Sequence, residues 1–404
     1  MKLLFLTVAY PQGSEQYLQD LNRGTPMSIQ ANTFQWAVIE GLVRNEADFE
    51  VVSMPSLCCY PLNFKKLFSP QMDMVFEGKK VGTMLKTLRL KFVSGMAGQI
   101  QLKKHIKQWA QKYKDEDRLV VLAYATYSST LRIITSLKKD YHNMIVCPIV
   151  TDLVDDLLNP VYKRSLRFRI NSKKEIKAVK KTYSSIDRFI LLARSMEEKI
   201  PEAVGKNIVI EGIALNPNTK FVPKEEAVER ILLYTGSLGA HTCVMDLVDA
   251  FMLTKNPNYR LVICGTGPGG DYIKQAAKKD SRIIFKGFVS RDEAVRLQHE
   301  ATTVINPRKP TISLTKYSFP SKTMEYLSSG TPMIGYRLEG IPDEYYQYMY
   351  TVDGLEPEDL AYTITEVLEK PQEVLDAKAK EAMEFIATQK TAKIQVGKIL
   401  QFLS

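Results

Sequence analysis

The sequence has few cysteines and histidines, and their placement argues against several kinds of site. The 404 residues include five cysteines and four histidines. Neither residue type shows the short spacings typical of zinc ligands. Reduced structural thiols in a cytoplasmic protein are therefore expected. The residues are Cys58, Cys59, Cys147, Cys243 and Cys264, and His105, His142, His241 and His299.

Long apolar runs are also absent. No segment approaches the roughly 18 apolar residues that a membrane-spanning helix needs, and the 45% apolar and 25% charged content is typical of a globular protein. There is no serine-nucleophile elbow and no strand-flanked Asp-x-Asp, since Asp115-Glu116-Asp117 lies in a charged loop. The length exceeds one ordinary core and indicates two domains of about 200 residues each.

Acidic residues are nearly missing from two segments of the first half. Lys79–Lys114 contains ten Lys or Arg and no acid, and Val161–Lys181 contains nine with one acid, Glu175. Because polybasic segments attract anionic bilayers, a membrane-facing surface is favoured over plain solvated faces. Nucleic acid is not expected as a partner, since no interleaved aromatics or known module accompany the charge. The predicted membrane or acceptor residues are Lys103, Lys104, Lys107, Lys163, Arg164 and Arg167.

Strand-like apolar runs alternate with helical patterns, which predicts parallel α/β units in both halves. The expected strands are 2–8, 49–53, 119–123, 144–150 and 188–192, then 230–236, 260–264, 282–285, 302–305 and 333–336. An amphipathic helix is expected over 28–44, and the basic segments are expected to be helical. A turn-rich connector, 211–226, separates the halves.

The most informative segment is Lys316–Ile334. Ser321 stands where a helix is expected to begin, and Gly330-Thr331-Pro332 ends that helix before an apolar strand. Free backbone N–H groups and the positive end of the helix dipole then lie beside the Lys322 ammonium, which suits a diphosphate. Glu325, one turn further, can accept hydrogen bonds from two ribose hydroxyls. The alternative is an ordinary surface helix that Ser321 caps.

Two glycine-rich turns follow predicted strands. Tyr234–Gly239 combines glycines with hydroxyls that can donate to phosphate. Gly265–Gly270 matches G-x-G-x-x-G, but the next strand is followed by the basic Lys286, where a dinucleotide site needs an acid. Arg308 can add positive charge or be a solvated loop residue. Asp152 ends a strand, where a catalytic carboxylate and a capping aspartate are both possible.

The Ser318–Lys322 stretch, with Glu325 after it, resembles the nucleotide-sugar site of GT-B glycosyltransferases. It is most similar to the family-4 retaining enzymes that build bacterial capsule and exopolysaccharide. Two positions depart from that family's pattern. The first glutamate of its glutamate pair falls at Tyr317, and its lysine-glycine pair falls at Thr242-Cys243.

The resemblance implies a GT-B fold, in which two Rossmann-like domains face each other across a cleft. The implied domains are an acceptor-binding domain, 1–212, a nucleotide-sugar domain, 226–385, and a helix over 386–404 that returns to the first domain. The implied donor site is Gly13, Gly236, Ser237, Gly267, Phe288, Arg308, Pro320, Ser321, Lys322 and Glu325, with Asp152 and Lys322 as catalytic residues.

The resemblance also implies an activity. A hexose would move with retention from a nucleoside-diphosphate sugar, most simply a UDP-sugar, to a lipid-linked saccharide at the cytoplasmic face of the membrane, without metal or cofactor. The alternatives are a non-catalytic partner that keeps the fold, and a sugar-nucleotide epimerase or phosphorylase. An epimerase needs carboxylates and histidines that the sequence does not place together. A pyridoxal-dependent phosphorylase needs a much longer chain.

Overall fold

The computed structural model describes residues 1–25, 29–124, 127–158, 165–214, 217 and 219–404. The chain divides into two compact units. Unit 1 comprises Met1–Leu215 with Ala392–Ser404, and unit 2 comprises Asn216–Thr391. The segment that returns to unit 1 starts later than 386, because helix α12 (Gln372–Gln389) continues with Phe385 and Ile386 packed inside unit 2.

Unit 1 is built on an eight-stranded sheet in the order β3-β4-β2-β1-β5-β6-β7-β8. Every pairing is parallel except β3 with β4. All six residues of β1 are buried, as expected for the centre of a sheet covered on both faces. The strands are β1 (Lys2–Thr7), β2 (Phe49–Ser53), β3 (Met72–Phe76), β4 (Lys79–Met84), β5 (Leu119–Tyr124), β6 (Met144–Val150), β7 (Phe189–Leu191) and β8 (Asn207–Val209).

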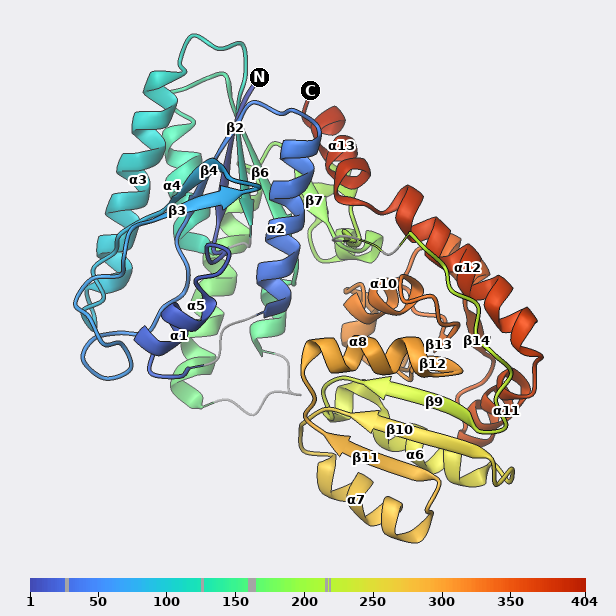
Figure 1. Cartoon of the computed structure of the whole chain (residues 1–404). Coiled ribbons are helices and arrows are strands. Elements are labelled where there is room, and N and C mark those ends of the chain that lie inside the picture. Colours follow the sequence, from blue (N-terminus) through green and yellow to red (C-terminus); the bar gives the residue numbers. More distant parts are fainter. Residues whose placement is uncertain (26–28, 125–126, 159–164, 215–216, 218) are drawn as a thin grey trace. The chain divides into compact units, whose positions relative to one another are not determined.

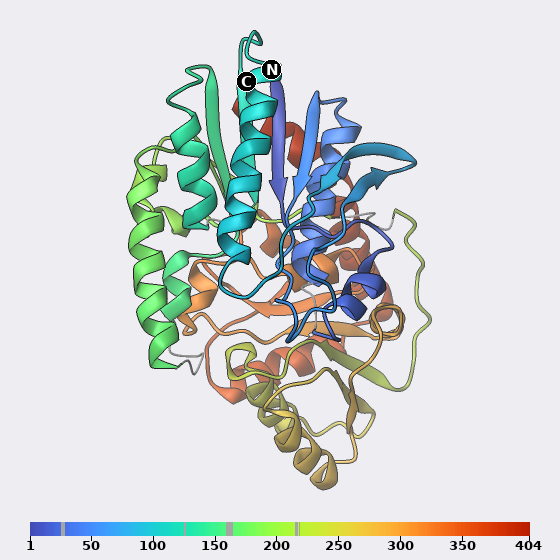
Figure 2. The same ribbon diagram turned by 90° about the vertical axis from the view of Figure 1, so that its left-hand side faces the viewer.

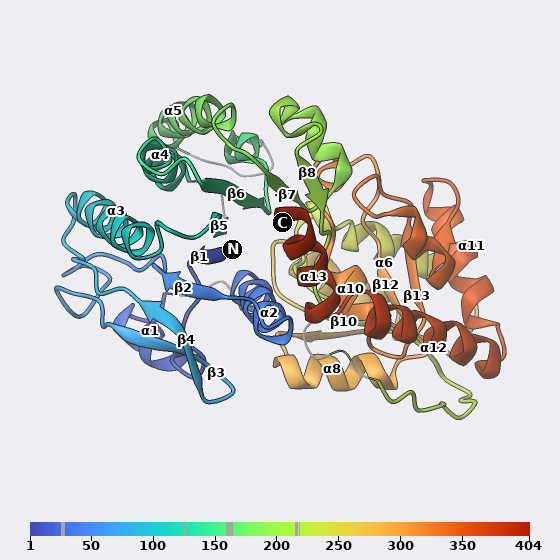
Figure 3. The same cartoon turned by 90° about the horizontal axis from the view of Figure 1, so that it is seen from above.

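Helices cover both faces of this sheet. In Figure 3, α3, α4 and α5 lie on one face, and α2 and α13 lie side by side on the other. Gly41 permits the contact between α2 and α13, since a Cβ there would lie 2.3 Å from a Val396 methyl. The helices are α1 (Glu15–Leu21), α2 (Ile29–Arg44), α3 (Ser94–Lys112), α4 (Ser128–Leu137), α5 (Leu166–Tyr183) and α13 (Ala392–Leu403).

The basic segment 79–114 is only partly helical, which corrects the prediction. Its first six residues form β4, an antiparallel partner of β3. The turn between the two strands is Glu77-Gly78, with φ values of 47° and 77°. Two consecutive residues with positive φ form the kind of turn that closes a two-residue hairpin. Regular helix starts only at Ser94.

Unit 2 contains a six-stranded parallel sheet in the order β11-β10-β9-β12-β13-β14. In Figure 1, α8 and α10 lie on one side of it, and α6 and α7 lie on the other. The strands are β9 (Arg230–Thr235), β10 (Tyr259–Cys264), β11 (Ile283–Gly287), β12 (Thr303–Asn306), β13 (Met333–Tyr336) and β14 (Tyr350–Val352). The helices besides α12 are α6 (Val244–Leu253), α7 (Gly270–Lys279), α8 (Arg291–Glu300), α9 (Ser313–Lys316), α10 (Ser321–Leu327) and α11 (Pro357–Leu368).

Lys224 fixes the start of unit 2 to its sheet. Its ammonium donates to the Ala301 carbonyl at 2.7 Å and to the Thr331 hydroxyl at 2.6 Å. Burial lowers the pKa of Lys224 to about 8, and the nearby Asp376 carboxylate opposes the shift. The cost of burying a charge thus exceeds the benefit of its partners.

This pKa predicts how stability changes with pH. Above about pH 8 the folded state releases the Lys224 proton while the unfolded state keeps it to about pH 10.4, so stability rises with pH. Relative to Lys224→Met, the wild type should gain about 1 kcal/mol of unfolding free energy between pH 7 and pH 9. Urea unfolding at both pH values measures the difference. Exposed Lys274→Met should show no such gain, and an equal gain in both variants would contradict the prediction.

Candidate functional site

Two loops at the carboxyl ends of β9 and β10 pack directly on each other. The Gly236 N–H donates to the Cys264 carbonyl at 2.9 Å, and the Leu238 N–H donates to the Thr266 carbonyl at 3.0 Å. Glycine makes this approach possible, since a Cβ on Gly265 would lie 1.7 Å from the Gly236 carbonyl oxygen. The two loops form a rigid surface at the carboxyl edge of the sheet, where ligands of such folds bind.

Ser237 and Gly267 are exposed on these loops. Thr242 supports Ser237 from below, because its hydroxyl donates to the Ser237 carbonyl at 3.0 Å and to the Gly239 carbonyl at 2.7 Å. The next residue, Cys243, is buried and has a φ of 54° at the start of α6. The Thr242-Cys243 pair therefore shapes the loop instead of supplying a cation.

Helix α10 is anchored to the end of β9 through Tyr326. The buried Tyr326 hydroxyl accepts from the Thr235 N–H at 3.0 Å and donates to the Thr235 carbonyl at 3.2 Å. Thr323, Met324 and Leu327 are buried with it. The remaining face of this two-turn helix carries Lys322 and Glu325, as the sequence predicts.

The Lys322 ammonium lies beside the first glycine loop. Its nitrogen is 3.4 Å from the Thr235 hydroxyl and 3.8 Å from a Glu325 carboxylate oxygen. A Cβ on Gly236 would come within 2.7 Å of the Lys322 side chain. Burial lowers the pKa of Lys322; Glu325 opposes this shift and Arg308 adds to it. A cation held in this way gains from an anionic ligand.

Glu325 is held by a residue that sequence reasoning missed. Its carboxylate accepts from the Gln298 side-chain amide at 2.6 Å, and the same amide donates to the Thr235 hydroxyl at 3.2 Å. Gln298 is 1% exposed and is the one buried residue assigned to α8, so no apolar periodicity marked it. The side chain of Glu325 remains 45% exposed and can accept further hydrogen bonds.

Other predicted donor residues surround this group in unit 2. Arg308 follows β12, is half-buried, and interacts electrostatically with Lys322 and His241. Phe288 follows edge strand β11 and is 79% exposed. Pro320 is the residue before α10, and the side chain of Ser321 is exposed. No side-chain cap begins this helix, so its first turn differs from the Ser321-capped alternative.

Tyr317 occupies the position of the expected first glutamate. It ends the short helix α9 and is half-buried, with the Lys316 ammonium 5.7 Å from its ring centroid. The following turn packs closely on another loop, since a Cβ on Gly340 would lie 2.1 Å from the Ser318 carbonyl oxygen. The site therefore contains one carboxylate on this stretch, that of Glu325.

The remaining predicted residues belong to unit 1. Gly13 has a φ of 75°, with open space where a Cβ would point. Asp152 follows β6, is exposed, and accepts from the Thr151 hydroxyl at 3.1 Å. Nearby, burial raises the pKa of Tyr124 to about 12, with a further contribution from Asp152. The predicted site residues are thus divided between the two units.

Three predicted membrane residues, Lys103, Lys104 and Lys107, are exposed on α3. Lys163 and Arg164 lie outside the described residues, as does the side chain of Arg167 in α5. Within the described residues no three His, Cys, Asp or Glu side chains gather as metal ligands. None of the helices there combines the length and apolar character that a membrane crossing requires.

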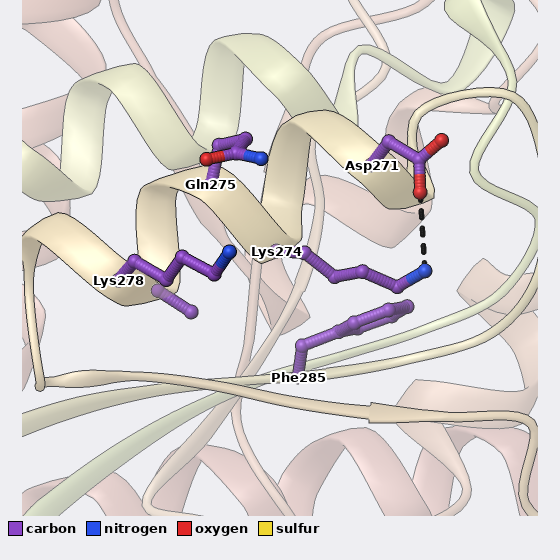
Figure 4. Close-up of a pocket in the computed structure, with 6 residues that line it drawn as sticks. Asp271, Lys274, Gln275, Lys278 and Phe285 are labelled. Atoms are coloured by element: carbon purple, nitrogen blue, oxygen red, sulfur yellow. Dashed lines mark hydrogen bonds and ion pairs between the residues drawn. The ribbon is translucent and has the colours of Figure 1, made fainter.

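Figure 4 shows a separate hollow of about 500 Å³ between α7 and β11. Its lining includes Phe285, Lys278 and the ion pair between Asp271 and Lys274, whose atoms are 3.1 Å apart. None of the predicted site residues lines it. The candidate site is therefore the surface formed by the glycine loops and α10, not this hollow.

Comparisons with known proteins agree with this assignment. Residues 229–370 match the family described as "Glycosyl transferases group 1". No curated protein matches the chain in sequence. The matched region contains both glycine loops, Lys322 and Glu325. The prediction of a glycosyltransferase is confirmed at this level, while membership of family 4 and a role in capsule synthesis stay predictions.

Several solved structures resemble the chain over its length. The lipopolysaccharide outer core galactosyltransferase WaaB has a TM-score of 0.58 and 15% identity, covering 100% of this chain and 99% of its own. S. aureus TarM, in complex with UDP and saccharide ligands, has a TM-score of 0.59, 10% identity and full coverage of both chains. Anabaena HepE, in complex with UDP and glucose, has a TM-score of 0.58, 13% identity and coverage of 100% and 99%. These likenesses confirm the GT-B fold with its two Rossmann-like domains.

Proposed function

We propose that this glycosyltransferase moves a hexose with retention from a UDP-sugar to a polyprenyl-linked oligosaccharide in bacterial surface polysaccharide synthesis. The observation that carries the proposal is the arrangement of Lys322, Glu325 and the Gly236-Ser237 loop within one unit. It offers a cation, a ribose acceptor and a close backbone approach, which are the three features a nucleoside-diphosphate sugar needs.

The ligands of the structural neighbours support the uridine donor. TarM and HepE were both solved with UDP, and HepE also with glucose. In the proposed complex the Lys322 ammonium faces the diphosphate, and Glu325 accepts from the ribose hydroxyls. Exposed Phe288 and the backbone beside it are available to the base. Gln298 fixes the orientation of the Glu325 carboxylate before the donor arrives.

Charge stabilisation is the proposed source of catalysis. As the bond from the sugar to the diphosphate breaks, negative charge builds on the phosphate oxygens, and Lys322, Ser237 and Arg308 stabilise it. The acceptor hydroxyl attacks the same carbon from the face that the diphosphate leaves, and its proton passes to the departing diphosphate. Positive side chains carry this scheme, so it requires no metal ion. Asp152 is the proposed carboxylate on the acceptor-binding unit.

Retention has support from one neighbour. A solved structure of trehalose-6-phosphate synthase, with a TM-score of 0.63 and 9% identity, comes from work on enzymatic glycosyl transfer with retention. We extend this outcome to the present chain because the proposed site offers a departing diphosphate and no second carboxylate on the Lys316–Ile334 stretch. The absence of a carboxylate at Tyr317 is compatible with this scheme, which assigns no step to that position.

The proposed place of action is the cytoplasmic face of the cell membrane. A lipid-linked acceptor requires the acceptor-binding unit to reach the bilayer, and that unit carries the exposed Lys103, Lys104 and Lys107. Each lysine near an anionic surface contributes roughly 1 kcal/mol to binding.

Ligand-induced stabilisation tests the donor assignment. A UDP-sugar at 100 times its dissociation constant should stabilise the protein by about 2.7 kcal/mol and raise its melting temperature. A panel of UDP-, GDP-, ADP- and CMP-sugars, read by thermal shift, should show the rise for a UDP-sugar. Donor turnover with a crude lipid extract then separates an enzyme from a non-catalytic partner. Stabilisation by none of the nucleotides would contradict the proposed site.

A further inference from the structure

The start of α3 exposes apolar side chains to solvent. Phe92 is 85% exposed, Met96 66% and Ile100 65%. They do not belong to the core face of the helix, which is formed by other residues such as Leu102, Ile106 and Trp109. Large apolar side chains that gather at an exposed helix end mark a surface that contacts something apolar.

The same face of α3 becomes cationic further along. Met96, Ile100, Lys103 and Lys107 follow one another at spacings of four, three and four residues, which places them on one face of a helix. Both lysines are exposed. The Lys91 ammonium also lies 5.0 Å from the centre of the exposed Phe92 ring. The face therefore has an apolar tip and a lysine-bearing body.

Helix α5 repeats this pattern. Leu166, Ile170, Lys173 and Lys177 have the same spacings of four, three and four residues, and all four are exposed. Leu166 is 73% exposed and Ile170 47%. The only acid of this helix, Glu175, accepts from the Ser128 N–H at 2.8 Å and its hydroxyl at 2.7 Å, at the start of α4. Glu175 is thus engaged with α4 and does not neutralise the lysine face.

The two tips share one edge of unit 1. Helices α3 and α5 both pack against α4 on the same face of the sheet. Figure 2 shows that both start near the end of the sheet where the parallel strands finish. Two separate helices therefore present an apolar tip and a cationic body in the same direction along the sheet.

From these features we infer that the tips of α3 and α5 insert into an anionic bilayer. Phe92, Met96, Ile100, Leu166 and Ile170 enter the acyl boundary, and the lysines of both helices contact the lipid phosphates. A lipid surface is favoured over a protein partner because lysine is depleted from the cores of protein interfaces. This inference rests on the membrane docking in the proposed function and adds the residues that insert.

Quenching of tryptophan by brominated lipid tests the insertion. Met96→Trp and Ile170→Trp each place a new fluorophore at a tip, on positions exposed enough to accept it. The native Trp36 and Trp109 are each 3% exposed. With vesicles of phosphatidylglycerol and acyl-brominated phosphatidylcholine, emission of the new tryptophan should fall at least twofold relative to unbrominated vesicles. Val204→Trp is the matched control, since Val204 is 60% exposed and precedes β8, at the opposite edge of the same sheet.

Co-sedimentation of the wild-type chain in the same vesicles separates the possible failures. Sedimentation without quenching at either tip would overturn insertion and leave lysine docking intact. Absence of sedimentation would overturn docking and insertion together, while the nucleotide-sugar thermal shift reports on the donor site independently. Equal quenching of the Val204→Trp protein would also overturn the assignment to these tips. High salt should weaken sedimentation but leave a residual bound fraction, because exposed charges are screened and apolar contacts are not.

Discussion

Replacing Lys322 with alanine should lower turnover by about 10²–10³-fold, the effect typical of removing one donor that stabilises developing negative charge. Binding of uridine alone should change little, because the ammonium faces the diphosphate and not the nucleoside. Steady-state kinetics with the donor identified by thermal shift, together with calorimetric titration of uridine and UDP, measure the two effects separately.

The unliganded variant should be as stable as the wild type or more so. A lysine pKa that is lower in the folded than in the unfolded protein means that folding disfavours its charged form. Lys322 therefore opposes folding of the unliganded protein and becomes favourable when the diphosphate binds. Removing it should cost activity without lowering the melting temperature, the signature of a functional rather than a structural side chain.

Lys274→Ala provides the matched control. Lys274 also lies in unit 2 and also has a carboxylate partner three residues away, Asp271 at 3.1 Å. It lines the hollow beside α7 rather than the glycine loops, so its loss should leave turnover unchanged. Full turnover in Lys322→Ala would mean that another cation meets the phosphate charge, with Arg308 the first to examine.

Strands are predictable where they are buried on both faces, because burial requires a continuous apolar run. The six buried residues of β1 are an example. The hairpin of β3 and β4 is not predicted, because Lys79–Met84 begins with two lysines and resembles the basic helix that follows. Its signal is local, namely the Glu77-Gly78 pair at a two-residue turn. Gly82 also needs the strand, since a Cβ there would lie 2.0 Å from the Val51 carbonyl oxygen.

The site is predictable where one continuous segment forms it. Lys322 and Glu325 share a helix, so their spacing alone places them on one face. Gln298 and Thr242 cannot be found in this way, because each reaches the site from a different element. Their roles are contacts with the Glu325 carboxylate and the Ser237 carbonyl. A polar residue that supports a neighbour through tertiary contact leaves no periodic trace in the sequence.

Glu325→Ala should weaken binding of the intact donor more than any change at the protein surface. Two ribose hydroxyls lose a charged acceptor, and each such hydrogen bond contributes about 1.5–3 kcal/mol. The dissociation constant of UDP should therefore rise at least roughly tenfold, and by more than a hundredfold if both bonds contribute fully. Folding should change little, because the carboxylate is 45% exposed and Gln298 keeps its contact with Thr235.

Two further variants give this prediction its specificity. Glu325→Gln keeps one oxygen that can accept but removes the charge, so its affinity for UDP should lie between those of the wild type and Glu325→Ala. Glu300→Ala removes an exposed glutamate of neighbouring α8, whose partner is Arg296 at the protein surface, and should bind UDP as the wild type does. Isothermal titration with UDP and with 2′-deoxy-UDP completes the test. If Glu325 accepts from the ribose, the deoxy ligand should lose affinity for the wild type but lose much less for Glu325→Ala. Equal losses in both proteins would place the ribose elsewhere and remove Glu325 from the donor site.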